Sequence, residues 1–307
     1  MDSRLPADVA LLEETARKRF QRLGGVDVAR RAESEPLRRD VAAGALAELG
    51  AGDLDVRADP DQLLAGAALC RAAGSVVLPW PVVGQLLRVE GRYLAMVDAS
   101  CVRIDHGSVG VGWIAADLTG GAWLAGQGRP GVTGRLGPFV VAAGLDEPAR
   151  PLDAGDRARY LILQAWLVLG ALETAVADVV EHLRARRQFG HALADFQAIR
   201  FAMADVTVSL RGLEQLSKAT TWRLGRGDER EGLADAMALR LHAADVAVAT
   251  LRAAHQFYGA LGFCDETDLS VIDRHLQPTL RYPLSAERIA QALVPFVRGR
   301  TLTGNIT

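Results

Sequence analysis

One long apolar segment constrains the fold of this 307-residue chain more than any other feature. Residues 156–187 contain the run "YLILQAWLVLGALETAVADVV" and no proline. A helix over this range would be about 45–50 Å long, with Asp156 as its expected N-cap. Because the run also contains Gln164, Glu173 and Asp178, it favours a buried bundle helix over a membrane span.

The spacing of apolar residues divides the chain into three parts. Residues 1–87 are expected to be helical. Residues 88–150 hold short alternating or β-branched stretches between glycines, which predict a small antiparallel sheet or partial barrel. Residues 151–307 are expected to form a helical bundle, so the fold class is mainly α with a small middle β domain. The expected helices cover about 37–49, 60–73, 156–187, 195–226, 230–258 and 285–297, and the expected strands lie within 92–105, 108–118, 121–126 and 137–145.

Composition excludes several classes of function. A net charge of −2 gives no reason to expect binding to nucleic acid or to an anionic membrane. The three cysteines show no CxxC spacing and their number is odd, which favours a reducing, cytoplasmic location over a disulfide framework. The first residues carry no apolar run typical of a signal peptide. The histidines do not share a metal-ligand spacing with acidic residues, so no metal site is expected.

The stretch "RARRQFGHALADFQAIRFAMAD", residues 184–205, carries the first candidate site. Arg186 is placed where a guanidinium can pair with phosphate oxygens, and Phe189 can supply an apolar wall. Gln197, which is expected to be sheltered, can both donate and accept hydrogen bonds. The simpler alternative is that the arginines complement the C-terminal dipole of a helix, Gly190 caps it, and Gln197 is solvated.

The stretch "QFYGALGF", residues 256–263, carries the second candidate site. Gln256 offers a side-chain amide, and a turn through Gly259 and Ala260 would let backbone N–H groups approach a diphosphate. The alternative is an ordinary turn at the end of a helix.

Taken together, these motifs resemble those of the acyl-CoA dehydrogenase family, in order and spacing. The matching positions are Arg186, Phe189, Gly190, Gln197, the stretch from Gln256 to Phe263, and Arg274. The resemblance implies an N-terminal helical domain at 1–87, a reduced middle β domain at 88–150 and a C-terminal four-helix bundle at 151–307. It also implies that both motifs bind FAD, mostly that of a neighbouring subunit, and that the substrate is an acyl-CoA. Ala260 departs from the glycine that is usual in the family, and it adds a methyl group at a point of close approach.

The catalytic base of the family is missing from both of its known positions. One position falls on Pro283, counted from Arg274, and the other on Tyr160, counted back from Phe189. Proline has no basic side chain, and a phenol with a pKa near 10 is a poor base at neutral pH. The threonine- and serine-rich stretches that bind the flavin ring in the family are also not found within 88–150. No catalytic residue is therefore expected in this chain.

The resemblance is greatest to short dehydrogenase-like chains that form α2β2 pairs in bacterial steroid and lipid catabolism. It implies a heterotetramer in which a partner subunit supplies the base and most of the acyl-CoA site. Two alternatives stay open. One is a homotetramer with a relocated base at Glu173, Asp178 or Glu287, and the other is a helical scaffold that binds acyl-CoA or a protein without redox chemistry. The apolar stretch 161–169 is expected to need a partner bundle.

Overall fold

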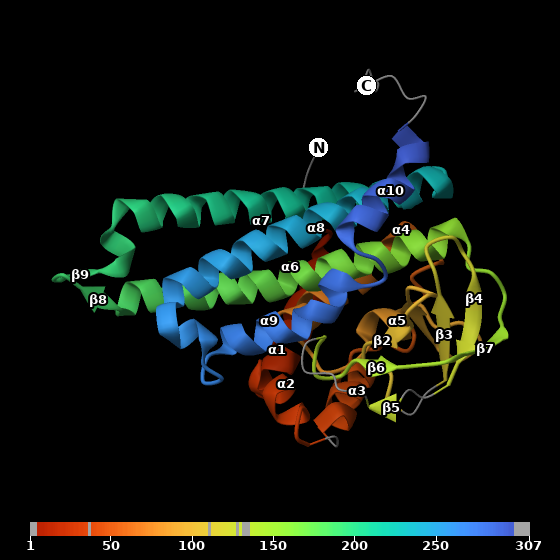
Figure 1. The fold of residues 1–307 in the computed structure, drawn as a ribbon, viewed down its shortest axis with the longest axis horizontal. Coiled ribbons are helices and arrows are strands. Elements are labelled where there is room, and N and C mark those ends of the chain that lie inside the picture. Colours follow the sequence, from red (N-terminus) through yellow and green to blue (C-terminus); the bar gives the residue numbers. More distant parts are fainter. Residues whose placement is uncertain (1–4, 36–37, 110–111, 127–128, 131–135, 298–307) are drawn as a thin grey trace.

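A computed structural model describes residues 5–35, 38–109, 112–126, 129–130 and 136–297, and it shows a long helical bundle with smaller parts around it (Figure 1). The N-terminal helices lie along one side of the bundle. Two small sheets lie near one end of the bundle, and a β-hairpin projects from the other end (Figure 1). The prediction of a mainly α fold with a small β region is confirmed.

The N-terminal part contains five helices, and the fourth begins as its sequence predicts. The Asp59 side chain accepts a hydrogen bond from the Gln62 N–H at 2.8 Å, and Pro60 occupies the first helical position. The helices are α1 (Ala7–Arg22), α2 (Asp27–Ala32), α3 (Arg38–Glu48), α4 (Pro60–Gly74) and α5 (Val82–Leu86).

The C-terminal part is built on α6, which has 32 residues and is therefore about 48 Å long. Its N-cap is Asp153, whose side chain accepts from the Asp156 N–H at 2.7 Å, so the expected cap at Asp156 was wrong. Asp156 is instead buried, where it pairs with Arg57 at 2.8 Å. The helices are α6 (Ala154–Ala185), α7 (Gln197–Leu224), α8 (Glu229–Tyr258), α9 (Asp268–Arg281) and α10 (Ala286–Val297), with short 3-10 helices η1 (Leu193–Asp195) and η2 (Gly259–Phe263).

The β region differs from the expected antiparallel sheet in one pairing. A four-stranded sheet has the order β1-β3-β4-β7, and β1 pairs with β3 in parallel. The parallel pairing follows because the intervening strand β2 leaves for a second sheet of order β2-β6-β5. Residues 110–111, within one expected strand, lie outside the described residues. The strands are β1 (Tyr93–Met96), β2 (Arg103–Ile104), β3 (Trp113–Ala116), β4 (Ala122–Ala125), β5 (Arg129–Pro130), β6 (Val141–Ala142) and β7 (Leu145–Pro148).

Two glycines let α4 and α6 cross with their backbones in contact. A Cβ atom added at Gly74 would lie 1.9 Å from the carbonyl oxygen of Leu167. A Cβ atom added at Gly170 would lie 1.9 Å from the carbonyl oxygen of Arg71. Since neither obstacle is a movable side chain, only glycine fits at both positions, and the crossing fixes the N-terminal helices on the bundle.

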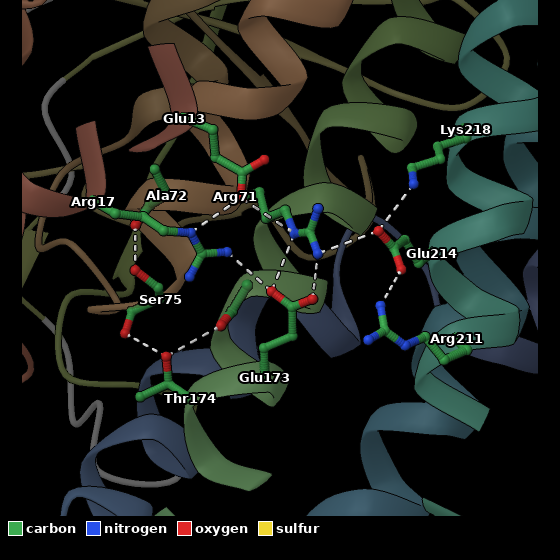
Figure 2. A network of polar contacts seen from close by, with 11 residues as sticks. Glu13, Arg17, Arg71, Ala72, Ser75, Glu173, Thr174, Arg211, Glu214 and Lys218 are labelled. Carbon is green, nitrogen blue, oxygen red and sulfur yellow. Dashed lines mark hydrogen bonds and ion pairs between the residues drawn. The ribbon is translucent and has the colours of Figure 1, made fainter. Parts of the chain in front are cut away.

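A network of ion pairs surrounds this crossing (Figure 2). Arg71, whose side chain is 11% exposed, bonds Glu173 through two nitrogens and lies 3.4 Å from a carboxylate oxygen of Glu214. Arg17 from α1 donates to Glu173 at 2.9 Å, and Lys218 donates to Glu214 at 3.0 Å. The network therefore ties α1, α4, α6 and α7 together, and it engages both carboxylate oxygens of Glu173.

The apolar run in α6 is buried within this chain. Leu161, Ile162, Leu163 and Leu169 are at most 1% exposed. Among the described helices, α6 is long and apolar enough to cross a membrane, yet 67% of its apolar window is buried inside the protein. The expectation that residues 161–169 need a partner bundle was wrong, because helices of the same chain cover them.

The crossing can be tested with two glycine-to-alanine substitutions. Gly170→Ala should destabilise the chain by roughly 3 kcal/mol, because the new methyl group meets backbone that cannot swing away. Gly212→Ala in α7 is the matched control: no atom lies within 4 Å of the position that its methyl group would take, and removing a helical glycine should stabilise by about 0.5–1 kcal/mol. Urea denaturation measures both, and equal effects would contradict the close crossing.

Candidate functional site

The predicted corner between α6 and α7 is a tight β-hairpin. α6 ends at Ala185, and β8 (Arg187–Gln188) pairs with β9 (His191–Ala192) across a two-residue turn. The turn residues Phe189 and Gly190 both have left-handed backbones, with φ of 53° and 81°. Left-handed φ is unfavourable for phenylalanine, so the hairpin holds this side chain outward at a cost in backbone strain.

The predicted contact residues of this corner are exposed. Phe189 is 89% exposed, the largest such fraction among the exposed large hydrophobic side chains of the described chain. Arg186 and Gln197 are exposed as well, so the expectation of a sheltered Gln197 was wrong. Gln197 is the first residue of α7, at the tip of the bundle, where no other part of the described chain covers it.

Four arginines gather at this corner. Arg184, Arg186, Arg187 and Arg200 are all exposed, and none of them forms an ion pair within the described part of the chain. The charge reaches the neighbouring His182, whose pKa is lowered by burial and by the Arg186 guanidinium. An exposed aromatic ring beside unpaired guanidinium groups is suited to an anionic ligand with a flat ring, such as a nucleotide diphosphate.

The second motif lies at the same end of the bundle (Figure 1). The ring of His182, near the end of α6, stacks on Tyr258, the last residue of α8, with 4.5 Å between ring centroids. Gln256, Gly259 and Ala260 are exposed just beside this contact. The structure thus brings the six predicted cofactor-binding residues to one end of the molecule.

A pocket lies elsewhere, near the other end of α6, close to the two positions where the resemblance places a base. Tyr160 lines this pocket, and so does Tyr282, the neighbour of the buried Pro283. At 1.5 Å per residue, Tyr160 lies about 39 Å along the helix from Arg186. The corner and the pocket are therefore separate sites in this chain.

The pocket is small, and aromatic side chains form part of its wall and pack behind it. Its volume is about 80 Å³, and its walls come from α5, β1, β3, the start of α6, and α9. Tyr93 stands edge-on to both Trp80 and Trp113, at 6.3 and 5.7 Å between ring centroids. Pockets for drug-sized ligands usually measure 300–1,000 Å³. A flavin ring together with an acyl chain does not fit here.

None of the three acids considered as relocated bases lines this pocket. Glu173 is held in the network around Arg71. Asp178 lies towards the corner, and its pKa is raised to about 6 by burial and by Asp268 and Glu181. Glu287 is exposed on α10. The alternative with a relocated base at one of these positions is therefore not supported.

Sequence reasoning missed an acid that does line the pocket. Asp105 follows β2, and burial raises the pKa of its carboxyl group to about 7, although a nearby Arg39 opposes the shift. About 29% of its side chain stays accessible, on a wall where apolar groups replace bulk water. Tyr160 is also buried, and its pKa is raised to about 12. Asp105 stands in no recognisable motif, so only the fold could place it here.

FAD fits one of these sites and not the other. At the corner, unpaired guanidinium groups and an exposed ring match the adenosine-diphosphate part of the cofactor. At the pocket, the volume excludes the flavin ring.

Comparison with known proteins identifies the bundle. Residues 158–283 match the family described as "Acyl-CoA dehydrogenase, C-terminal domain". This part of the chain is similar to the C-terminal domain of acyl-CoA dehydrogenases. The match spans both motifs at the corner end of the bundle, and also Tyr160 and Pro283.

Curated relatives align with part of the chain. The chain is 31% identical over 109 residues to the short-chain specific acyl-CoA dehydrogenase of Megasphaera elsdenii. This alignment covers 36% of this chain and 27% of that protein. The chain is 27% identical over 136 residues to 3-sulfinopropanoyl-CoA desulfinase of Variovorax paradoxus, covering 44% and 32%. The aligned stretches thus span a third or less of these relatives.

Solved structures match almost the whole chain in fold. The ChsE4–ChsE5 complex from Mycobacterium tuberculosis aligns with a TM-score of 0.79 at 15% identity, covering 98% of this chain and 100% of that chain. A Tcur3481–Tcur3483 steroid ACAD variant gives 0.73 at 18% identity, covering 93% and 96%. Butyryl-CoA dehydrogenase from Megasphaera elsdenii gives 0.66 at 16%, covering 95% and 98%. The predicted acyl-CoA dehydrogenase fold is confirmed.

The burial of Asp105 predicts how stability depends on pH. Its pKa in the folded chain is raised to about 7, because burial favours the protonated carboxyl group. The contribution of this group to the free energy of unfolding is therefore fully present below about pH 4 and is lost as the pH rises through about 7. At about 1.4 kcal/mol per pKa unit, and allowing for partial solvent access, Asp105→Asn should stabilise the chain by roughly 2–3 kcal/mol at pH 8. At pH 4 the two proteins should be equally stable. Urea denaturation at both pH values measures this, and a difference that does not change with pH would contradict it.

Proposed function

We propose that this chain is a subunit of a heteromeric, FAD-dependent acyl-CoA dehydrogenase and that it contributes to the FAD site of a catalytic partner. The observation that carries the proposal is the separation of the two sites. The corner at Arg186 has the groups that an adenosine diphosphate needs, while the pocket about 39 Å away is too small for a flavin ring. A flavin held at the corner would therefore react in another chain.

Each predicted contact residue would bind a different part of FAD. Arg186 would pair with phosphate oxygens, and Phe189 would cover the adenosine side. Gln197 and Gln256 would bond fixed polar atoms, while Gly259, with φ of 60°, would let the backbone come close. The methyl group of Ala260 lies beside this turn. The bound flavin would supply hydride acceptance for the α,β-dehydrogenation of an acyl-CoA thioester, and the partner would supply the base.

An exposed apolar stripe on α7 supports assembly with another chain. Helix α7 lies at one edge of the bundle (Figure 1). Its side chains Phe201, Val208, Leu216 and Trp222 are 37–71% exposed. A stripe of this kind on a helix is typical of a protein interface. Two of the structures with the same fold are named for pairs of chains, ChsE4–ChsE5 and Tcur3481–Tcur3483, and this favours an α2β2 heterotetramer here.

Substrate class and location complete the proposal. The name of one matching structure, a steroid ACAD, favours an acyl group from steroid or lipid catabolism. The cysteines Cys70, Cys101 and Cys264 are all free, which suits a reducing cytoplasm.

Both rival functions meet an obstacle. A self-sufficient dehydrogenase needs a base in its pocket, and Asp105 could serve, but the pocket does not hold flavin and substrate together. A scaffold without redox chemistry has no use for a strained, exposed Phe189 beside unpaired arginines.

The first test uses the chain alone and with its partner. The isolated chain should be colourless and inactive with acyl-CoA, and the assembled complex should bind FAD and reduce a dye acceptor. Flavin absorbance and the rate of dye reduction measure both properties. A yellow, active isolated chain would establish the self-sufficient enzyme instead.

The second test removes the predicted phosphate contact. In the assembled complex, Arg186→Ala should weaken FAD binding about ten- to a hundredfold, since a charge-assisted hydrogen bond contributes about 1.5–3 kcal/mol. Arg186→Lys should recover only part of this, because an ammonium group lacks the planar fork of a guanidinium. Arg184→Ala, on the last turn of α6, is the matched control. Equal losses in the Arg184 and Arg186 variants would leave only the helix-dipole explanation of the corner.

A further inference from the structure

The turn of the second candidate site, η2, has little core of its own. Gly262 is the one buried residue among the five of η2. Leu261 and Phe263 are 50% and 80% exposed. The turn begins at Gly259, where a left-handed φ of 60° lets the chain leave α8. Because so few of its contacts are buried, the position of this turn depends on residues outside it.

His255, in the last turn of α8, packs directly against η2. Its ring stacks on the Phe263 ring, with 5.2 Å between the ring centroids and 24° between the ring planes. A Cβ atom added at Gly262 would lie 3.2 Å from the Nδ1 atom of His255 and 3.2 Å from its carbonyl oxygen. The histidine therefore contacts both the backbone of the turn and its last side chain.

Asp273 of α9 sets the orientation of the His255 ring. Its Oδ2 atom lies 3.1 Å from His255 Nε2, and because a carboxylate only accepts hydrogen bonds, the ring donates from Nε2. The other oxygen of Asp273 accepts from the Gln277 side chain at 2.6 Å. With both carboxylate oxygens engaged, Asp273 holds the ring in one orientation beneath Phe263.

The His255 ring is placed to hold the turn and not to transfer protons. Its Nε2 atom is engaged by Asp273, and its Nδ1 atom is buried. Neither nitrogen is therefore free to exchange a proton with a bound molecule. The exposed groups that could meet a ligand are its neighbours, since Gln256, Gly259 and Ala260 follow it within five residues.

We propose that His255 and Asp273 are positioning residues for the cofactor: they hold the turn at residues 259–263 where its backbone N–H groups would meet the diphosphate of FAD. Neither residue touches the cofactor in this account, and both act through the turn. The inference rests on the proposed function, because it takes FAD as the ligand of the turn.

The first measurement uses the isolated full-length chain and needs neither FAD nor a partner. Hydrogen–deuterium exchange is compared in the wild type and in Asp273→Ala, which removes the acceptor of the His255 ring. The amides of Gly259 and Cys264 donate hydrogen bonds at the two ends of the turn. We expect these amides to exchange at least about fivefold faster in the variant, while the hairpin at residues 187–192 exchanges as before. Unchanged exchange in the turn would overturn the inference.

Two further variants keep this measurement decisive. Asp273→Asn is the matched control, because its amide keeps an oxygen that can accept from His255, and its turn should exchange within about twofold of the wild type. Phe263→Leu removes the stacked ring at an exposed position and should accelerate exchange as Asp273→Ala does. Melting temperatures establish that each variant is folded. If Asp273→Ala is unfolded, Phe263→Leu decides the result, and unchanged exchange there would overturn the inference.

The second measurement is an FAD titration of the complex with the partner subunit. Asp273→Ala should weaken FAD binding about three- to tenfold, because a loosened turn must be ordered again when the cofactor binds, and Asp273→Asn should bind as the wild type does. Faster exchange in the turn together with unchanged FAD affinity would overturn the role in cofactor positioning. A wild-type complex that binds no FAD would instead refute the proposed function, and the exchange measurement would still decide whether His255 and Asp273 hold the turn.

Discussion

The rest of the structure depends on the backbone contact between α4 and α6 at Gly74 and Gly170. Because a single methyl group at either position would strike a carbonyl oxygen 1.9 Å away, the two helices have one allowed crossing. The ion pairs of Arg71 and Glu173 lie beside this contact and add specificity, since removing one partner would leave a buried charge unpaired. The crossing places the N-terminal helices and the sheets against one end of α6 and leaves the other end free.

Because α6 is long, its two ends carry two separate sites. One end of the helix carries Tyr160 into a small pocket lined in part by aromatic side chains, and the other end carries Arg186 to an exposed corner. A charged, strained and solvent-exposed corner is unfavourable for an isolated chain. An anionic ligand bound together with a partner subunit would pair with the arginines and cover the exposed Phe189 ring. The proposed function follows from that contrast between a small pocket and an open corner.

The sequence predicted the parts of the molecule that depend on neighbouring residues. The corner and the turn at Gly259 were found because their contact residues lie within short stretches, and the long helix was found from its apolar run. Features set by distant contacts were not predictable. Asp105, Trp113 and Gln164 meet only through the fold, the parallel pairing of β1 and β3 depends on where β2 goes, and α9 was missed because Pro278 lies inside it. The exposure of Gln197 was missed because helical periodicity does not show which end of a bundle is uncovered.

Photolabelling with an FAD analogue that carries an azide on its adenine ring tests the central claim most directly. The assembled complex of this chain with its catalytic partner would be irradiated, digested and analysed by mass spectrometry. The proposed function predicts that the label falls on this chain between residues 186 and 197 or near Gln256, and that one flavin is bound for each pair of chains. Label confined to the partner, or one flavin bound by every chain, would contradict it.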